Sequence, residues 1–412
     1  MAGEIQELVE DLADRLGVPV MLEDREERVV AYSSQSSPVD EVRRQSILRR
    51  KTEPEVMAWF RSFGILQATA PLRIPRHPEQ GILARLCLPV RFRSRLMGFV
   101  WLIDDDEALG DEEVALARGL VEQLALLMYE EELDQRLTSR ILSHLLSSSE
   151  ELREASISQI ADQHLFPTDA PFVVVVLVPL GIPGPDAREP LCQALWDVGR
   201  EVGPGDILHM ACTDHGILLV RTGSLDDDEG AASCAERGRE ALARRLAPGP
   251  GRVIAALGDP QGRLCDAIVS YRQARLAARV AAAVPGLGDL PRWRRLGAYR
   301  VLAQIPSDQA VESSLDPRLL ALFSSGDLEA ITTLETYLDL AGDAKATADR
   351  LYLHRATLYY RLNKVERLTG ISLKDGEDRL AMHLGLKLSR LCGLHPAPEA
   401  ATGEPSRPGV TA

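Results

Sequence analysis

The segment ATADRLYLHRATLYYRLNKVERLTGISL, residues 346–373, is the most informative stretch of the chain. Apolar residues at helical spacing, stopped by a glycine at position 370, predict a helix over Arg355–Thr369. A shorter helix is expected over Lys345–Leu351, and a third over about Leu328–Leu340. Only Tyr352–His354 separates the helix expected at 345–351 from the helix expected at 355–369. Because this connection is so short, these two helices must cross steeply. This arrangement is typical of a helix-turn-helix.

The helix expected over Arg355–Thr369 has two chemically distinct faces when its residues are projected at about 100° each. Leu358, Leu362 and Val365 form an apolar stripe that should pack into the domain. The opposite face carries amide, hydroxyl, cationic and aromatic groups, the side chains that contact DNA. The candidate DNA-binding residues of this domain are Lys345, Thr347, His354, Arg355, Thr357, Tyr359, Tyr360, Asn363, Lys364 and Arg367.

The charge of this segment differs from that of the whole chain. A formal net charge of -14 argues against a surface coated in positive charge for bulk nucleic-acid or membrane binding. Between Ala341 and Gly370, however, six Lys or Arg residues oppose three acidic ones. A local basic patch is expected of a DNA-binding module. An ordinary helical bundle with a solvated cationic face is the alternative, and charge alone favours it. The tight turn and the polar and aromatic groups opposite the apolar stripe make the two readings about even.

The same segment resembles the C-terminal helix-turn-helix of PucR-like regulators, the purine-catabolism and sugar-diacid group. The positions that match the family pattern are Thr347, Ala348, Leu351, Leu353, His354, Arg355, Thr357, Leu358, Tyr360, Arg361, Leu362, Val365, Glu366, Gly370 and Leu373. Two positions depart from it. Ala356 replaces the usual Asn, which removes an amide able to pair with adenine, and Tyr359 stands where Arg is common. The resemblance implies DNA binding, with a different or narrower operator.

Residues 165–290 predict an α/β domain upstream of the helix-turn-helix domain, which we place at 326–392. The run Phe172–Val178 is continuously apolar, as in a buried central strand. Further strands are expected at Ile207–Cys212, Gly216–Arg221 and Arg252–Leu257, with helices at 189–202, 231–246 and 261–283, giving one compact mixed sheet. The last helix contains SYRQARLAARV (Ser270–Val280), which resembles the end of the PucR family's central domain, a degenerate relative of the GGDEF fold.

The GGDEF resemblance raises a nucleotide cyclase as an alternative function. That chemistry needs a glycine pair where phosphates approach and carboxylates that hold a divalent metal. The corresponding turn, Cys212–Gly216, has one carboxylate and no glycine pair. Cys212, Asp214 and His215 are near neighbours in that turn and rarely complete a metal site. We therefore expect no enzyme activity, no cofactor and no metal, and a dimerisation or relay role for this domain.

Residues 1–108 predict a small α+β domain. An amphipathic helix at 4–16 precedes two short strands, Val18–Leu22 and Val29–Tyr32. A helix at 53–63 and an apolar strand pair at 82–90 and 96–103 follow. The order resembles GAF or PAS sensor domains in architecture, which implies a response to a small molecule or a partner.

A long helix from Asp111 to about Leu146 lies within the connecting segment 109–150. Leucines recur along it, which suits a helix that packs on a partner helix. Packing of this helix on its own domain is equally consistent with the pattern. A homodimer is expected on other grounds, because a lone helix-turn-helix reads only a few base pairs.

Composition places the chain in a reducing compartment. None of the six cysteines is spaced as C-x-x-C, which favours reduced thiols in a cytoplasm. The N-terminus is not a signal peptide, no apolar run is long enough for a membrane span, and the tail 394–412 is expected to be disordered.

Together these observations predict a multidomain α/β and α+β protein with an all-α C-terminal domain. The favoured hypothesis is a cytoplasmic bacterial transcription regulator that binds double-stranded DNA as a homodimer and responds to a possible small-molecule effector. The alternative is a sensor or protein-interaction scaffold whose helix-turn-helix has lost contact with DNA.

Overall fold

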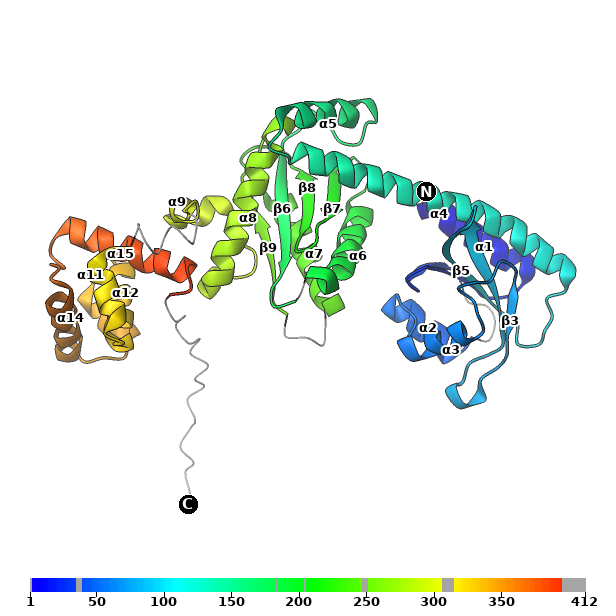
Figure 1. Cartoon of the computed structure of the whole chain (residues 1–412), viewed down its shortest axis with the longest axis horizontal. Coiled ribbons are helices and arrows are strands. Elements are labelled where there is room, and N and C mark those ends of the chain that lie inside the picture. The colour runs from blue at the N-terminus through cyan, green and yellow to red at the C-terminus, as the bar shows by residue number, and fades with distance from the viewer. Residues whose placement is uncertain are drawn as a thin grey trace, which may run out of the picture. The chain divides into compact units, whose positions relative to one another are not determined.

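The computed structural model describes residues 2–34, 39–182, 184–203, 205–246, 251–305 and 315–394. The chain divides into two compact units, Met1–Leu137 and Thr138–Ala412 (Figure 1). A mixed α/β architecture with a helical C-terminal region is confirmed. The tail that we expected to be disordered lies, apart from Leu394, outside the described residues. No helix in the described ranges combines the length and apolar character needed to cross a membrane.

The first unit is built on a five-stranded antiparallel sheet of order β2-β1-β5-β4-β3. Its strands are β1 (Val20–Asp24), β2 (Val29–Tyr32), β3 (Leu72–Ile74), β4 (Arg85–Phe92) and β5 (Arg95–Ile103). Strand β5 is buried on both faces, so its alternate residues enter two different cores. Val100 and Leu102 pack with α1 (Ala2–Leu16) and α4 (Asp111–Leu145). Phe99 and Trp101 pack with α3 (Pro54–Ser62).

Helix α2 (Glu41–Arg49) was not foreseen from the sequence. Its buried residues are Arg43 and Ser46, both polar, so it lacks the apolar periodicity that identifies a helix. Asp40 caps its N-terminus by accepting a hydrogen bond from the Arg43 amide at 2.9 Å. The same carboxylate forms a buried ion pair with Arg85 on β4. The helix is therefore positioned by polar contacts rather than by an apolar stripe.

A buried carboxyl group lies between α2 and the sheet. Glu23 on β1 accepts a hydrogen bond from Trp101 Nε1 at 2.7 Å and another from the Thr52 hydroxyl. Loss of water around the side chain raises the pKa of Glu23 from 4.5 to about 7, although both hydrogen bonds and Arg85 act in the opposite direction. Burial also raises the pKa of Asp24, from 3.8 to about 6.

The first unit should lose stability as the pH rises from about 4.5 to 7. In this window folded Glu23 holds a proton that the unfolded chain has released, and the difference is worth roughly 3 kcal/mol. Glu23→Gln should reduce the decline by about that amount, with Asp24 contributing the remainder. The free energy of unfolding of the parent and of the variant is measured by urea titration at pH 5 and pH 7.5, with hydrogen exchange of β5 peptides as the probe of the first unit. An equal decline in the variant and the parent would contradict this assignment.

The central part of the second unit is a four-stranded sheet of order β7-β8-β6-β9. Its strands are β6 (Phe172–Pro179), β7 (Ile207–Ala211), β8 (Gly216–Arg221) and β9 (Val253–Leu257). The expected mixed sheet is wrong, because every pairing among these strands is antiparallel. Strands that a helix connects are not neighbours in the sheet. Strands β6 and β7 run in the same direction but are separated by β8, and β8 and β9 run in the same direction but are separated by β6.

Helices cover both faces of this sheet (Figure 1). Val173, Val175 and Leu177 of β6 share a core with α6 (Gly184–Val202) and α7 (Glu229–Leu246). On the other face, the Ser270 hydroxyl of α8 (Ala267–Ala283) accepts a hydrogen bond from the Val174 amide at 3.0 Å. The long helix α4 and the unforeseen α5 (Glu150–Asp162) precede this domain, and the short α9 (Tyr299–Leu302) follows it.

Candidate nucleic-acid interface

Five helices form the C-terminal bundle: α11 (Pro317–Ser324), α12 (Leu328–Asp339), α13 (Ala344–Arg350), α14 (Arg355–Thr369) and α15 (Gly376–Leu391). Helix α14 has the bounds predicted from the sequence. Its predicted apolar stripe, Leu358, Leu362 and Val365, is buried in the core that it shares with α11 and α12. The stripe fixes the rotation of α14 about its axis and so determines which of its side chains face outward.

Local capping defines the turn before α14. Asp343 begins α13 by accepting hydrogen bonds from the Lys345 and Ala346 amides at 2.8 and 3.0 Å. His354 begins α14 with its Nδ1 accepting from the Ala356 amide at 3.3 Å. Between them, Tyr352 adopts a positive φ of 53°, a conformation that is uncommon for residues other than glycine. The caps thus fix the residues at which α13 and α14 begin.

The outward face of α14 carries most of the predicted DNA-binding residues. Tyr360 is 63% exposed, and Asn363 and Arg367 are also exposed. These three residues and Glu366 line an open hollow of about 560 Å³. Exposed residues nearer the start of the helix-turn-helix are Lys345, His354, Arg355, Thr357 and Tyr359.

Thr347 does not lie on this face, although the sequence analysis included it among the candidates. Its side chain is fully buried, and its hydroxyl donates to the Asp343 carbonyl at 2.6 Å. The residue stabilises α13 against the bundle and has no surface to offer DNA. A threonine on a short helix gives no apolar signal, so the sequence did not show which way it points.

Ion pairs divide the six Lys and Arg residues of α13 and α14 into two groups. Lys364 pairs with Asp327 at 2.5 Å, which raises the pKa of its ammonium group, and Arg361 pairs with Glu329 at 2.8 Å. No ion pair is recorded within the described ranges for Lys345, Arg350, Arg355 and Arg367. The Arg355 guanidinium lies over the Tyr359 ring, 5.6 Å from its centroid. Four cations are therefore left to meet an anionic partner.

Two surface residues beside α14 were missed by the sequence analysis. Tyr352 is 97% exposed at the tip of the turn, and Arg350 is exposed at the end of α13. An aromatic side chain held almost entirely in water contributes little to packing of the bundle, and its ring is accessible to a partner. The available signal was an aromatic residue placed between two helices where a small turn residue would fit better.

Comparison with known proteins agrees with this geometry. Residues 330–388 match the PucR C-terminal helix-turn-helix domain, and residues 148–280 match a GGDEF-like domain. The chain is 23% identical over 410 residues to the proline-responsive transcriptional activator PutR of Bacillus subtilis (strain 168), covering 94% of this chain and 97% of that protein. The DNA-binding transcriptional activator AdeR of the same organism is 20% identical over 411 residues, covering 94% of this chain and 93% of AdeR.

A shorter relative matches the C-terminal region more closely. The purine catabolism regulatory protein of Bacillus subtilis (strain 168) is 45% identical over 65 residues, which are 16% of this chain and 12% of that protein. The fold and these similarities define a DNA-binding transcription regulator of the helix-turn-helix class. Within that class, its C-terminal domain is of the PucR type, and its full-length relatives are named as regulators rather than as enzymes.

The apolar stripe of α14 should be essential for folding of the bundle. Leu362→Ala removes a side chain that is only 4% exposed, and we expect it to lower the free energy of unfolding by roughly 2–5 kcal/mol. Leu368→Ala is the matched control, because Leu368 lies on the same helix but is 45% exposed. It should change the free energy of unfolding by less than about 0.5 kcal/mol. Urea unfolding of the full chain measures both, and equal effects would show that the helix is rotated from the orientation described.

Proposed function

We propose that α14 enters the major groove of double-stranded DNA as the recognition helix. Its exposed N-terminal half, with Arg355, Thr357, Tyr359 and Tyr360, supplies the side chains closest to base edges, as in other helix-turn-helix proteins. The proposal rests on the four cations of α13 and α14 that form no ion pair within the described ranges, because DNA binding requires positive charge that the protein does not itself neutralise.

The proposed contacts divide between phosphates and bases. Lys345, Arg350 and Arg367 are placed to meet phosphates, which position the protein without reading sequence. Asn363 is the exposed amide of the helix and can accept and donate at one base edge. Ala356 offers only a methyl group, which suits contact with thymine rather than the hydrogen bonds of an asparagine. His354 and Lys364 act mainly through the cap and the ion pair that hold α14 in place.

We also propose that the protein acts as a homodimer. One helix-turn-helix covers a single half-site, so a pair of copies on repeated half-sites gives useful specificity. Helix α4 offers a surface for this, because Leu126 and Leu133 are 43% and 44% exposed and lie seven residues apart. Two such helices packed together would cover both leucines.

The N-terminal domain, residues 1–108, is proposed to be a GAF- or PAS-like sensor joined through the helix of residues 109–150. Its antiparallel sheet with helices on both faces supports that assignment. A full-length relative is described as proline-responsive, which supports a small-molecule effector here. The regulator is proposed to work in the cytoplasm.

The central domain, residues 165–290, is proposed to relay or dimerise rather than to catalyse. The hairpin between β7 and β8 carries the turn where a cyclase would hold metal and phosphate. There the Asp214 carboxylate lies 2.6 Å from His215 Nδ1 and accepts a bond from Arg275 at 3.3 Å. His215 Nε2 in turn lies 3.0 Å from the Tyr271 hydroxyl. Protein groups therefore occupy the only carboxylate of the turn. Formation of a cyclic dinucleotide from GTP and magnesium would overturn this reading.

The DNA-binding role is tested by mobility shift with DNA from upstream of the protein's own locus. Arg367→Ala should weaken binding and reduce the slope of log affinity against log salt by about one, as expected for one lost phosphate contact. Arg272→Ala on α8, an exposed arginine far along the chain from the bundle, is the control and should leave the slope unchanged. Absence of salt-dependent binding by the parent protein would favour a scaffold without DNA contact.

Tyr352 gives a second test of the interface. Tyr352→Asn suits the positive φ better, so the bundle should unfold at an equal or higher urea concentration. If the exposed ring contacts DNA, affinity should nevertheless fall several-fold in the same mobility-shift assay. Unchanged affinity would remove Tyr352 from the interface, and a large loss of stability would show that its ring has a structural role.

A further inference from the structure

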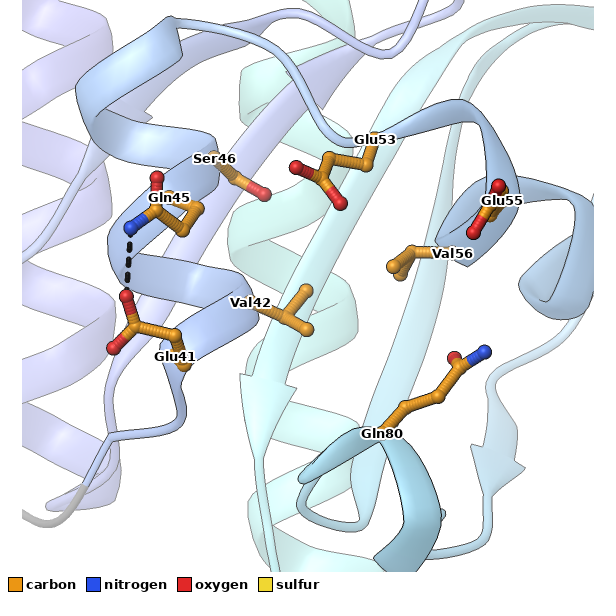
Figure 2. A pocket seen from close by; sticks show the side chains of 8 residues that line it. All are labelled: Glu41, Val42, Gln45, Ser46, Glu53, Glu55, Val56 and Gln80. Atoms are coloured by element: carbon orange, nitrogen blue, oxygen red, sulfur yellow. Dashed lines mark hydrogen bonds between the residues drawn. The ribbon is translucent and has the colours of Figure 1, made fainter.

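The first unit contains a cavity of about 390 Å³ at the margin of the core that α3 shares with β5. It is bounded by α2, by the start of α3 and by the short 3-10 helix η1 (Pro78–Gln80) (Figure 2). Its lining consists of Glu41, Val42, Gln45, Ser46, Glu53, Glu55, Val56 and Gln80. A volume of this size falls within the range of sites for small molecules.

The cavity has apolar walls, and all its charged lining residues are acidic. Val42 and Val56 provide apolar contact from opposite sides, as Figure 2 shows. The charged lining residues are the three glutamates, and the lining includes no Lys, Arg or His. Arg44 pairs with Glu41, and Arg49 pairs with Glu53. For Glu55 no ion pair is recorded within the described ranges, so the rim keeps net negative charge.

The floor of the cavity is Ser46, which is 2% exposed. Its hydroxyl oxygen lies 2.8 Å from the Thr52 hydroxyl oxygen. The Thr52 hydroxyl in turn donates a hydrogen bond to the buried Glu23 carboxylate. A hydroxyl has a single proton to donate. The Thr52 hydroxyl uses its one O–H in the hydrogen bond to Glu23. The hydrogen bond between the two hydroxyls must therefore be donated by Ser46 and accepted by Thr52. The Ser46 oxygen is then left with lone pairs only, as an acceptor at the floor.

The direction of this chain depends on Glu23 being ionised. Its pKa of about 7 means that the carboxylate form prevails at pH 8. The indole N–H of Trp101 donates to the other oxygen of the same carboxylate at 2.7 Å. Both oxygens of Glu23 therefore accept hydrogen bonds, and the proton order that leaves Ser46 as an acceptor is maintained.

We propose that this cavity binds a small aliphatic amine as its ammonium ion. The ammonium group, which has three donors and no acceptor, would donate to Ser46 and meet the charge of Glu55 and its neighbours. The short alkyl body would lie between Val42 and Val56. Carboxylate ligands without an amine are disfavoured by the same rim. That this is the effector site rests on the sensor role proposed above, whereas amine binding itself does not.

Occupation of the cavity can reach the sheet through α3. Val56 lines the cavity, and Phe60, one turn further along the same helix, has its ring 4.7 Å from that of Trp101. Trp101 also donates to Glu23, so both a packing contact and a hydrogen-bond chain join the cavity to β5. A ligand there should therefore alter tryptophan fluorescence.

The test uses the full-length chain at pH 8 with n-butylamine as the probe. Isothermal calorimetry and tryptophan fluorescence should both show saturable binding. The neutral analogue 1-butanol and the anionic analogue butyrate have chains of the same length, and each should bind at least about ten-fold more weakly, as expected for loss of a charge-assisted hydrogen bond. Equal binding of n-butylamine and 1-butanol, or no saturable binding of the amine, would overturn the proposal.

Two variants locate the site. Ser46→Ala should weaken n-butylamine binding about ten-fold, and Glu55→Gln about two- to five-fold, because the rim is solvated. Glu112→Gln is the matched control, since Glu112 is also an exposed glutamate in second position on its helix, and it should have no effect. Glu55 is exposed, so its variant keeps the proposal testable even if Ser46→Ala disturbs folding. Unchanged binding by Glu55→Gln would place the amine elsewhere.

The effector role is tested separately by mobility shift with and without saturating n-butylamine. A change in DNA affinity that is lost in Glu55→Gln would support the cavity as the effector site. Amine binding with no change in DNA affinity would keep the site and overturn its regulatory role. Failure of DNA binding in both conditions would count against the proposed function and leave the calorimetric result intact.

Discussion

Burial of the α14 stripe is the constraint on which the interface depends. Leu358, Leu362 and Val365 can leave water only by facing α11 and α12, and this removes the rotational freedom of the helix. Once that rotation is fixed, Tyr360, Asn363 and Arg367 must face outward. The same apolar contact that stabilises the bundle thus presents the polar side chains, and changes to the two faces have separable effects.

Electrostatics then selects among the cations that this packing exposes. The chain as a whole is acidic, and its carboxylates neutralise part of the basic segment. Asp327 and Glu329, at the start of α12, hold Lys364 and Arg361 and so tie α14 to its neighbour. Similar pairs join α12 to α15, where Glu335 pairs with Arg390. The four other cations of α13 and α14 lie along these two helices, which keeps the positive potential local in a negative protein.

The first unit differs from the C-terminal bundle in having ionisable side chains in its interior. Glu23, Arg43 and Arg85 are almost completely buried, and each is held by hydrogen bonds or an ion pair. Buried polar groups of this kind cost stability unless their partners are in place. A chain of two hydroxyl groups, those of Thr52 and Ser46, also joins the buried carboxyl of Glu23 to the cavity beside α2. The raised pKa of Glu23 is a consequence of the same burial.

The sequence by itself determined the elements whose signal is local. The bounds of α14, its buried stripe, the strands β6 and β8, and the long helix α4 all follow from periodicity, apolar runs and glycine punctuation within one segment. Tertiary structure alone decided features that depend on partners far along the chain. It oriented Thr347 inward, paired Lys364 with Asp327, made the central sheet wholly antiparallel, and formed α2 around Arg43 and Ser46. The physical reason is that hydrophobic periodicity reports which face of an element is buried. Strand order, ion pairing and polar burial depend on which distant residues meet there.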